Sequence, residues 1–232
     1  MFAFSGNQAA LAGITDFSLG LYGEKKFLIQ ELSYYKIAGT IPTASGNFGI
    51  VQDYYGYAEY NETNTGIAYA RKLGNKADAG LQFNYYNFRV SGYGQAGTVN
   101  VGAGVLFHLA ANVHLGLQVD NPFGGRFGNS GLEKLAAVYK MGLGNEVSEK
   151  FFISAEIEKE EKKPVDFHAG LIYKIIPQCT LRLGVLTGTS SFYFGTGFQF
   201  NIFRIDFMTS YHPRLGITPG LMLIYGLKKT AP

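Results

Sequence analysis

The chain has no tryptophan, a single cysteine and few charged residues, and each scarcity excludes a class of protein. Asp, Glu, Lys and Arg make up 16% of the 232 residues, against 47% hydrophobic and 15% aromatic residues. This balance excludes a disordered chain, which needs low hydrophobicity and high net charge. Cys179 has no partner for an internal disulfide. The net charge is only +3, and no Lys/Arg cluster alternates with aromatic residues, so we expect no nucleic-acid partner.

A long hydrophobic run is also missing. The two longest uncharged stretches, 90–119 and 183–203, are interrupted repeatedly by Gly, Thr, Ser, Gln and Asn. A membrane-spanning helix needs about 20 predominantly apolar residues, so neither stretch predicts one. The N-terminal stretch MFAFSGNQAALAG has no basic region followed by an apolar one, so no secretory signal is visible. Such a start is normal for a cytosolic protein, whereas an exported chain that starts in this way would be a mature or re-engineered form.

Motifs of known catalytic sites do not occur in the sequence. We find no G-x-S-x-G, H-E-x-x-H or P-loop, and no G-x-G-x-x-G between a strand and a helix. The four histidines are distributed over different predicted strands and loops. His108 and His114 bracket a predicted turn, where we expect a hydrogen-bonded pair near the periplasmic rim. The sequence therefore predicts no enzyme, no catalytic residue, no metal site and no cofactor.

What the sequence does contain is a repeated alternation of apolar and polar residues. In VHLGLQVD (113–120), every second residue is Val or Leu, and the residues between them are His, Gly, Gln and Asp. FFISAEIEK (151–159) and VDFHAGLIYKI (165–175) follow the same period of two, which is typical of β-strands. Gly, Asn, Ser, Thr and Pro dominate most connections. The predicted strands are 13–23, 31–41, 46–56, 63–73, 76–91, 96–109, 112–121, 134–144, 149–159, 164–175, 178–187, 190–201, 202–211 and 217–228.

The two faces of these strands indicate where the chain resides. The apolar faces consist almost wholly of Leu, Ile, Val, Phe and Tyr, whereas the polar faces are rich in Gly, Ser, Gln and His. A soluble antiparallel barrel or sandwich, the alternative, would carry many Lys and Glu outward and large apolar residues inward. An apolar exterior with a small, polar interior indicates a transmembrane barrel. We therefore predict an all-β fold, a single antiparallel transmembrane β-barrel of about 12–14 strands, with short loops and no hatch domain.

No change in composition divides the chain, so we expect one domain over 1–232, with 1–12 as a short periplasmic N-terminal segment. An even strand number places both termini on one side, the periplasmic side in bacterial barrels. The predicted outer loops are YGEKKF (22–27), YAEYNETN (57–64), SGYGQAG (91–97), NPFGGRFGNSGLEK (121–134), EKEEKKPV (158–165), TGTSS (187–191) and HPRLGITPG (212–220).

Two parts of the sequence resemble a family of outer-membrane barrels. NQAALAG (7–13) looks like the Asn-Pro-Ala-Gly-Leu-Ala segment before the first strand of FadL-like and PorV/PorQ-type barrels. The C-terminal half, from residue 150 onward, resembles the last six strands of PorV-type proteins of Bacteroidota. Gln8 and Ala10 stand where the family has Pro and Gly, and the long hatch of fatty-acid transporters is missing. The resemblance implies a fourteen-stranded barrel in the outer membrane of a Gram-negative bacterium.

Polar residues on the predicted inner faces are the candidate functional residues. They either line a water-filled pore and set its selectivity, or pair across the lumen and close it, because unpaired buried charges are costly. The predicted lumen-facing residues are Lys36, Lys140, Glu156, Glu158, Asp166, His168, Lys174, Arg182, Arg204 and Asp206.

The family resemblance favours one function and leaves a second open. PorV-type barrels act as partners in secretion complexes, so we expect an accessory or scaffold subunit of an outer-membrane protein secretion or biogenesis complex, with its lumen largely closed by paired charges. Its partners would be outer-membrane lipid and protein subunits of that complex. The alternative is a passive channel or a FadL-like transporter for small or hydrophobic solutes.

Overall fold

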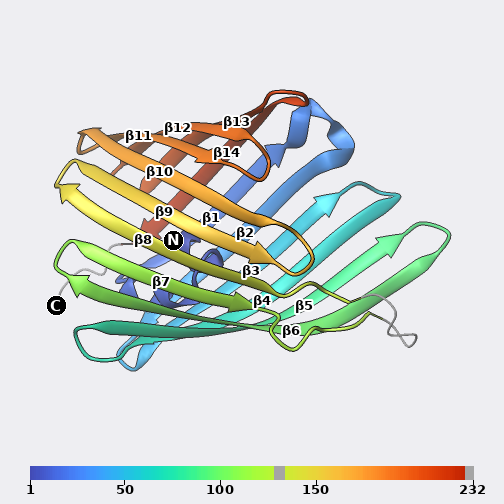
Figure 1. Ribbon diagram of the computed structural model, residues 1–232, viewed down its shortest axis with the longest axis horizontal. Helices are drawn as coiled ribbons and strands as arrows, with labels where there is room; N and C mark the ends of the chain where they lie inside the picture. The colour runs from blue at the N-terminus through green and yellow to red at the C-terminus, as the bar shows by residue number, and fades with distance from the viewer. Residues whose placement is uncertain (128–133, 228–232) are drawn as a thin grey trace.

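Fourteen strands form a closed antiparallel barrel in the computed structural model, which describes residues 1–127 and 134–227. Each strand pairs with its neighbours in sequence, and β1 closes the wall on β14, with Phe17 opposite Leu227 (Figure 1). Closure leaves no unpaired strand edge. The strands are β1 (Phe17–Lys25), β2 (Ser33–Thr43), β3 (Gly46–Gly56), β4 (Tyr60–Lys72), β5 (Ala77–Val90), β6 (Gly94–Ala110), β7 (Val113–Asp120), β8 (Val138–Ser148), β9 (Phe151–Glu160), β10 (Val165–Ile176), β11 (Cys179–Leu186), β12 (Ser191–Phe200), β13 (Phe203–His212) and β14 (Gly216–Leu227).

The observed strands confirm the predicted fold class. The largest offsets, of four residues, are at the start of β1, predicted at 13 and observed at Phe17, and at both ends of β8, predicted over 134–144 and observed over Val138–Ser148. Before β8, the backbone N–H of Leu135 donates to Gly125 O in the same loop, so this apolar residue belongs to the loop and not to the wall. The described residues of all seven predicted outer loops lie at the end of the barrel opposite the Phe17–Leu227 pair.

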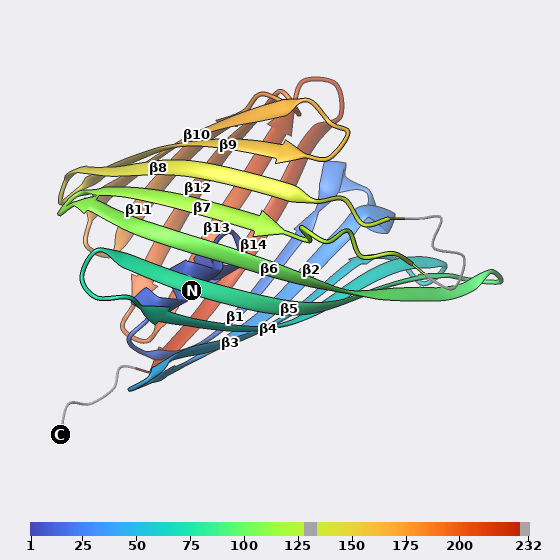
Figure 2. The ribbon, with the colours of Figure 1, turned by 60° about the horizontal axis from the view of Figure 1, so that its bottom comes forward.

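The wall is not of even height at its loop end. β5 and β6 have 14 and 17 residues, whereas β7 has only 8. Figure 2 shows the β5–β6 hairpin extending beyond the rest of the barrel. The middle of the predicted loop 121–134 and the chain end at 228–232 lie outside the described residues.

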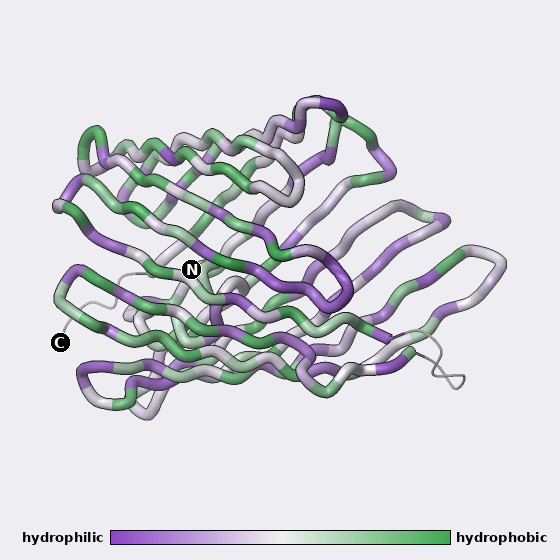
Figure 3. Tube along the Cα trace, viewed as in Figure 1, coloured by the Kyte–Doolittle hydropathy of each residue, from purple (hydrophilic) through white to green (hydrophobic). Residues whose placement is uncertain are grey.

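The strands place apolar side chains outside and polar ones inside. On β13, Phe203 and Phe207 are 52% and 53% exposed, while Asp206 between them is fully buried. On β3, Ile50 is exposed and its neighbour Val51 is buried. Figure 3 shows the same alternation along most of the strands. Because successive side chains of a strand point to opposite faces, one sequence period produces both surfaces. An apolar exterior of this kind needs an apolar surrounding.

The lumen contains the N-terminal segment, residues 1–13, which forms the 3-10 helices η1 (Phe2–Ser5) and η2 (Gln8–Gly13) (Figures 1 and 2). Phe4 and Leu11 are fully buried and pack against Val51 and the alanines of β2 and β4. We expected residues 1–12 to form a short periplasmic segment; in the structure their apolar side chains pack against the inner wall of the barrel. Across the described residues, no helix combines the length and the apolar character needed to cross a membrane.

Two further 3-10 helices, η3 (Lys26–Leu28) and η4 (Gln30–Leu32), form the loop between β1 and β2. Phe27 and Leu28 have φ values of 54° and 61° in this loop. Such values are uncommon for residues other than glycine. The backbone N–H of Phe27 donates to Thr218 Oγ1 of β14 at 3.0 Å, which ties the loop back to the wall.

Candidate functional site

The N-terminal segment is attached to the lumen wall by three amide side chains. Asn7 accepts from the backbone N–H of Ala9 at 3.0 Å and so caps η2. Its Nδ2 also donates to the carbonyls of Val105 and Leu117, at 3.3 and 3.2 Å. Two more contacts involve Gln8, which donates to Asp120, and Asn47 of β3, which donates to the carbonyls of Leu11 and Ile14. These bonds fix the segment at both ends of η2.

Close approach of the segment to the wall depends on glycines. A Cβ at Gly80 of β5 would lie 2.5 Å from the carbonyl carbon of Gln8. One at Gly104 of β6 would lie 2.2 Å from Oδ1 of Asn7. Real Cβ atoms do not approach backbone this closely, so any larger residue at Gly80 would displace the segment. The N-terminal segment therefore packs directly against the Gly-rich inner faces of β5 and β6.

Cavities lie on both sides of the segment. One has a volume of about 320 Å³ and lies between the segment and β6–β9; most of its surface is apolar, from residues such as Leu106 and Phe152, and His114, Lys140 and Glu156 also line it. The other has a volume of about 160 Å³ and is lined almost entirely by polar side chains. They are Ser5, Gln8, Lys36, Asp53, Asn64, Gln82, Asn84, Asn100 and Asp120. The segment thus separates a largely apolar space from a polar one.

The predicted lumen charges form ion pairs along the wall. Lys36 contacts Asp53 on the next strand at 3.3 Å, and Lys140 contacts Glu158 on the next strand at 2.7 Å. Strands that are neighbours lie about 4.8 Å apart, within reach of such side chains, whereas the opposite wall is much farther away.

A second group of charges surrounds the buried Asp206. Arg182 Nη1 lies 2.7 Å from Asp206 Oδ1, and Arg204 Nε lies 2.9 Å from Asp206 Oδ2. Arg182 is on β11 and Asp206 on β13, so their contact passes over β12. Gly197 makes this possible, because a Cβ there would lie 1.9 Å from Asp206 Oδ1. One carboxylate thus holds two guanidinium groups.

His168 lies between two carboxylates. Its Nδ1 is 3.1 Å from Glu156 Oε1 on β9, and its Nε2 is 3.0 Å from Asp166 Oδ2 on its own strand. Asp166 Oδ1 in turn accepts from Thr187 Oγ1 at 2.9 Å and from the backbone N–H of Gly188. The β11–β12 loop therefore orients Asp166, which contacts the ring of His168.

Nine of the ten predicted lumen residues take part in these pairs, and Lys174 is exposed near the end of β10. Every ion pair among these residues, in the part of the chain that the structure describes, joins one strand to itself, to its neighbour or to the strand after that. The expectation that paired charges close the lumen is therefore not met. Arg182 and Arg204 stay 25% and 30% exposed toward the interior.

The expected histidine pair is confirmed. His108 Nδ1 lies 2.9 Å from His114 Nδ1, and His108 Nε2 lies 3.0 Å from Asp78 Oδ2. The residues that sequence reasoning missed are Asn7, Gln8 and Asp120, which accepts from Gln8. The likeness of NQAALAG to a pre-barrel segment was the one signal that could have pointed to them.

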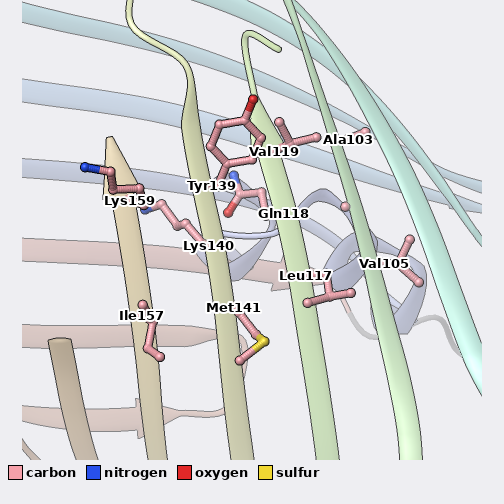
Figure 4. Close-up of a pocket in the computed structure, with 11 residues that line it drawn as sticks. Ala103, Val105, Leu117, Gln118, Val119, Tyr139, Lys140, Met141, Ile157 and Lys159 are labelled. Atoms are coloured by element: carbon pink, nitrogen blue, oxygen red, sulfur yellow. The ribbon is translucent and has the colours of Figure 1, made fainter. Parts of the chain in front are cut away.

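A further hollow lies on the outside of the wall, not in the lumen. It measures about 470 Å³ and is lined by outward residues of β6–β9 such as Val105, Leu117 and Met141, with Tyr139 and Lys159 toward one end (Figure 4). Its apolar floor faces the same surroundings as the rest of the exterior. The groove therefore belongs to the outer surface, separate from the lumen cavities.

The chain belongs to the structural class of closed fourteen-stranded antiparallel barrels, here with the N-terminal segment in the lumen, and solved structures share this fold. The monoaromatic hydrocarbon channel CymD matches with a TM-score of 0.77 at 10% identity, covering 99% of this chain and 94% of its own. The Pseudomonas putida toluene transporter TodX matches with 0.70 at 12% identity, covering 96% and 93%. A Pseudomonas aeruginosa FadL homologue matches with 0.65 at 10% identity, covering 95% and 91%.

At these identities the likeness shows a shared fold. No protein-family model matches the chain, and no curated protein matches its sequence. The FadL-like part of the predicted resemblance is thus confirmed at the level of fold, while the narrower PorV-type assignment stays a prediction.

Proposed function

We propose that this protein is an outer-membrane channel for small hydrophobic solutes. The observation that carries the proposal is the largely apolar cavity of about 320 Å³ between the N-terminal segment and β6–β9. Ligand pockets usually measure about 300–1,000 Å³, so this cavity suits one small molecule. The structural neighbours described as a monoaromatic hydrocarbon channel and a toluene transporter support the same choice of solute class.

The apolar exterior supports the membrane location. Phe203, Phe207 and Ile50 are about half exposed on the outer face, where only lipid would be a favourable surrounding. The barrel closes all strand edges by hydrogen bonding, as the hydrocarbon region requires. The outer membrane of a Gram-negative bacterium is the location that fits a barrel of this type.

The N-terminal segment is the part that would control passage. It divides the lumen, and its few polar anchors, Asn7, Gln8 and Asn47, can be broken without breaking the wall. A solute in the apolar cavity contacts Ala10 and Leu106, so its entry is coupled to the position of the segment. Of the paired wall charges, Lys140 and Glu156 also line this cavity, where Glu158 and His168 neutralise them.

Filling the cavity tests the proposal. A Cβ at Gly142 meets only ordinary contacts, the nearest at 3.6 Å, so Gly142→Phe should fold and place a ring in the cavity. Toluene uptake into cells or vesicles carrying the variant should fall at least several-fold. Gly226→Phe is the matched control, because its Cβ also has room, at 3.5 Å, and it lies outside the cavity lining. Equal uptake by the wild type and a folded Gly142→Phe barrel would contradict the proposal.

The scaffold function stays a prediction with its own test. Co-purification of a larger barrel in mild detergent, identified by mass spectrometry, would support it. The fold comparisons favour the channel, since the matched structures are described as channels and transporters.

A further inference from the structure

We propose that Glu156, Glu158 and His168 form a binding site for a divalent transition-metal cation of the Zn²⁺ type on the lumen wall. The proposal does not depend on transport of a hydrophobic solute. It rests on the geometry of two strands, on the protons that one imidazole can carry, and on the net charge around the site.

The strand register brings the three side chains together. Glu156 and Glu158 are two residues apart on β9 and therefore point to the same face. His168 of β10 is directly opposite Glu156 in the antiparallel ladder. One potential ligand atom from each of the three side chains lies within 4.8 Å of the other two. All three side chains are partly exposed, at 36%, 25% and 21%, so an ion in the lumen can reach them.

The imidazole of His168 faces an acceptor on each side. A neutral imidazole carries one N–H, so it can donate to one carboxylate only. Nδ1 lies 3.1 Å from Glu156 Oε1 at hydrogen-bonding geometry, whereas Nε2 lies 3.0 Å from Asp166 Oδ2 without the alignment of a hydrogen bond. A metal ion bound by Nδ1 and the Glu156 carboxylate would leave the ring N–H at Nε2, on the side of Asp166.

Asp166 supplies the partner that metal-binding histidines usually have. Ligating imidazoles almost always donate their other N–H to a carboxylate, a carbonyl or water, which fixes the tautomer. Asp166 Oδ2 lies 3.0 Å from Nε2, beside this position though not aligned for a hydrogen bond, and Thr187 and Gly188 hold the carboxylate there. The β11–β12 loop therefore keeps a carboxylate next to Nε2 before any ion binds, and a small rotation of the ring would complete the hydrogen bond.

The charge balance also favours a divalent cation. Three carboxylates, Glu156, Glu158 and Asp166, face one ammonium, Lys140, which gives −3 + 1 = −2 with His168 neutral. Lys140 contacts Oε2 of Glu158 at 2.7 Å, and the carboxylate has a second oxygen for an ion. Lys140 thus acts as the competing cation, and its removal should strengthen metal binding.

The side chains of the site, one imidazole and two carboxylates, indicate which metal ion it would bind. Imidazole together with carboxylates suits Zn²⁺ and other first-row transition ions, whereas Ca²⁺ and Mg²⁺ prefer oxygen ligands alone. Three protein ligands leave a coordination position for water. Zn²⁺ is therefore the probe, with Ca²⁺ as the comparison ion.

Calorimetric titration of the tag-free barrel in detergent with ZnCl₂ tests the site. We expect one saturable Zn²⁺ site per chain and no comparable site for Ca²⁺. His168→Gln and Glu158→Gln should each weaken the affinity at least tenfold, and Asp166→Asn by about 10–100-fold, as for other such partners. Lys140→Met should tighten it. Co²⁺ in place of Zn²⁺ should give a visible absorption band that His168→Gln abolishes.

Two control variants distinguish this site from Zn²⁺ binding elsewhere in the lumen. Asp53→Asn removes a different lumen carboxylate, and His114→Gln removes the other histidine cluster. Neither should change the affinity. Retained heat-dependent gel migration shows that each variant is folded. Absence of saturable Zn²⁺ binding in the wild type, or binding that survives His168→Gln but not His114→Gln, would overturn the proposal.

Discussion

Replacing Asp206 by asparagine removes the carboxylate that contacts both Arg182 and Arg204, and we expect a clear loss of stability. Removal of one partner from a fully buried ion pair costs about 3–5 kcal/mol, and from an exposed pair about 0–1 kcal/mol. Asp206 is fully buried, but its arginines are 25% and 30% exposed and can regain water in the lumen. The free energy of unfolding should therefore fall by about 2–3 kcal/mol.

The measurement must suit a chain without tryptophan. Urea unfolding in lipid vesicles, followed by circular dichroism and by the shift in gel migration, gives the unfolding midpoint. Arg204→Leu is the matched comparison, because Arg182 keeps Asp206 paired at 2.7 Å and the loss should be smaller. Gly197→Ala should resemble Asp206→Asn, since its Cβ would meet the Asp206 carboxylate. An unchanged midpoint for Asp206→Asn would refute this reasoning.

Three further predictions concern the N-terminal segment and the outer loops. Asn47→Ala removes the donor to two carbonyls of the segment, so limited proteolysis should cut near residue 13 faster than in the wild type, without unfolding the wall. Gly80→Ala places a Cβ 2.5 Å from the backbone of Gln8, so stable channel openings in planar bilayers should become more frequent as the segment is displaced; unchanged openings would contradict this. The Lys134 ammonium, hydrogen-bonded to Glu161 in the outer loops, lowers the pKa of that carboxyl. Their contact is therefore present at neutral pH and lost only below the ordinary range of glutamate, which an NMR titration of the Glu161 side chain measures.

The alternation of the sequence was sufficient to predict the wall. On β13, the alternation of odd- and even-numbered residues predicted Arg204 and Asp206 inside and Phe203 outside, and the structure confirms this. The alternation assigns each residue to a face because successive side chains of a strand point to opposite sides, whatever the neighbouring strands are. The alternation does not give the position of a residue along the barrel axis, nor the residue opposite it on the neighbouring strand. Both depend on strand register and loop length.

What could not be predicted depends on contacts between elements. His168 meets Glu156 only because of the turn between β9 and β10, and Arg182 reaches Asp206 only because Gly197 has no side chain. The N-terminal segment was missed for a different reason. Its longer helix, η2, has six residues, too few to show a helical period in the sequence.

The pair Phe17–Leu227 closes the wall after the N-terminal segment has ended, so no ladder of the barrel includes residues 1–13. The hydrogen bonds that make the cylinder and those that obstruct it are therefore two separate sets. A chain shortened to begin near Thr15 should still form the cylinder, now with an unobstructed bore. Such a barrel would be a compact starting point for a nanopore whose inner lining can be changed residue by residue.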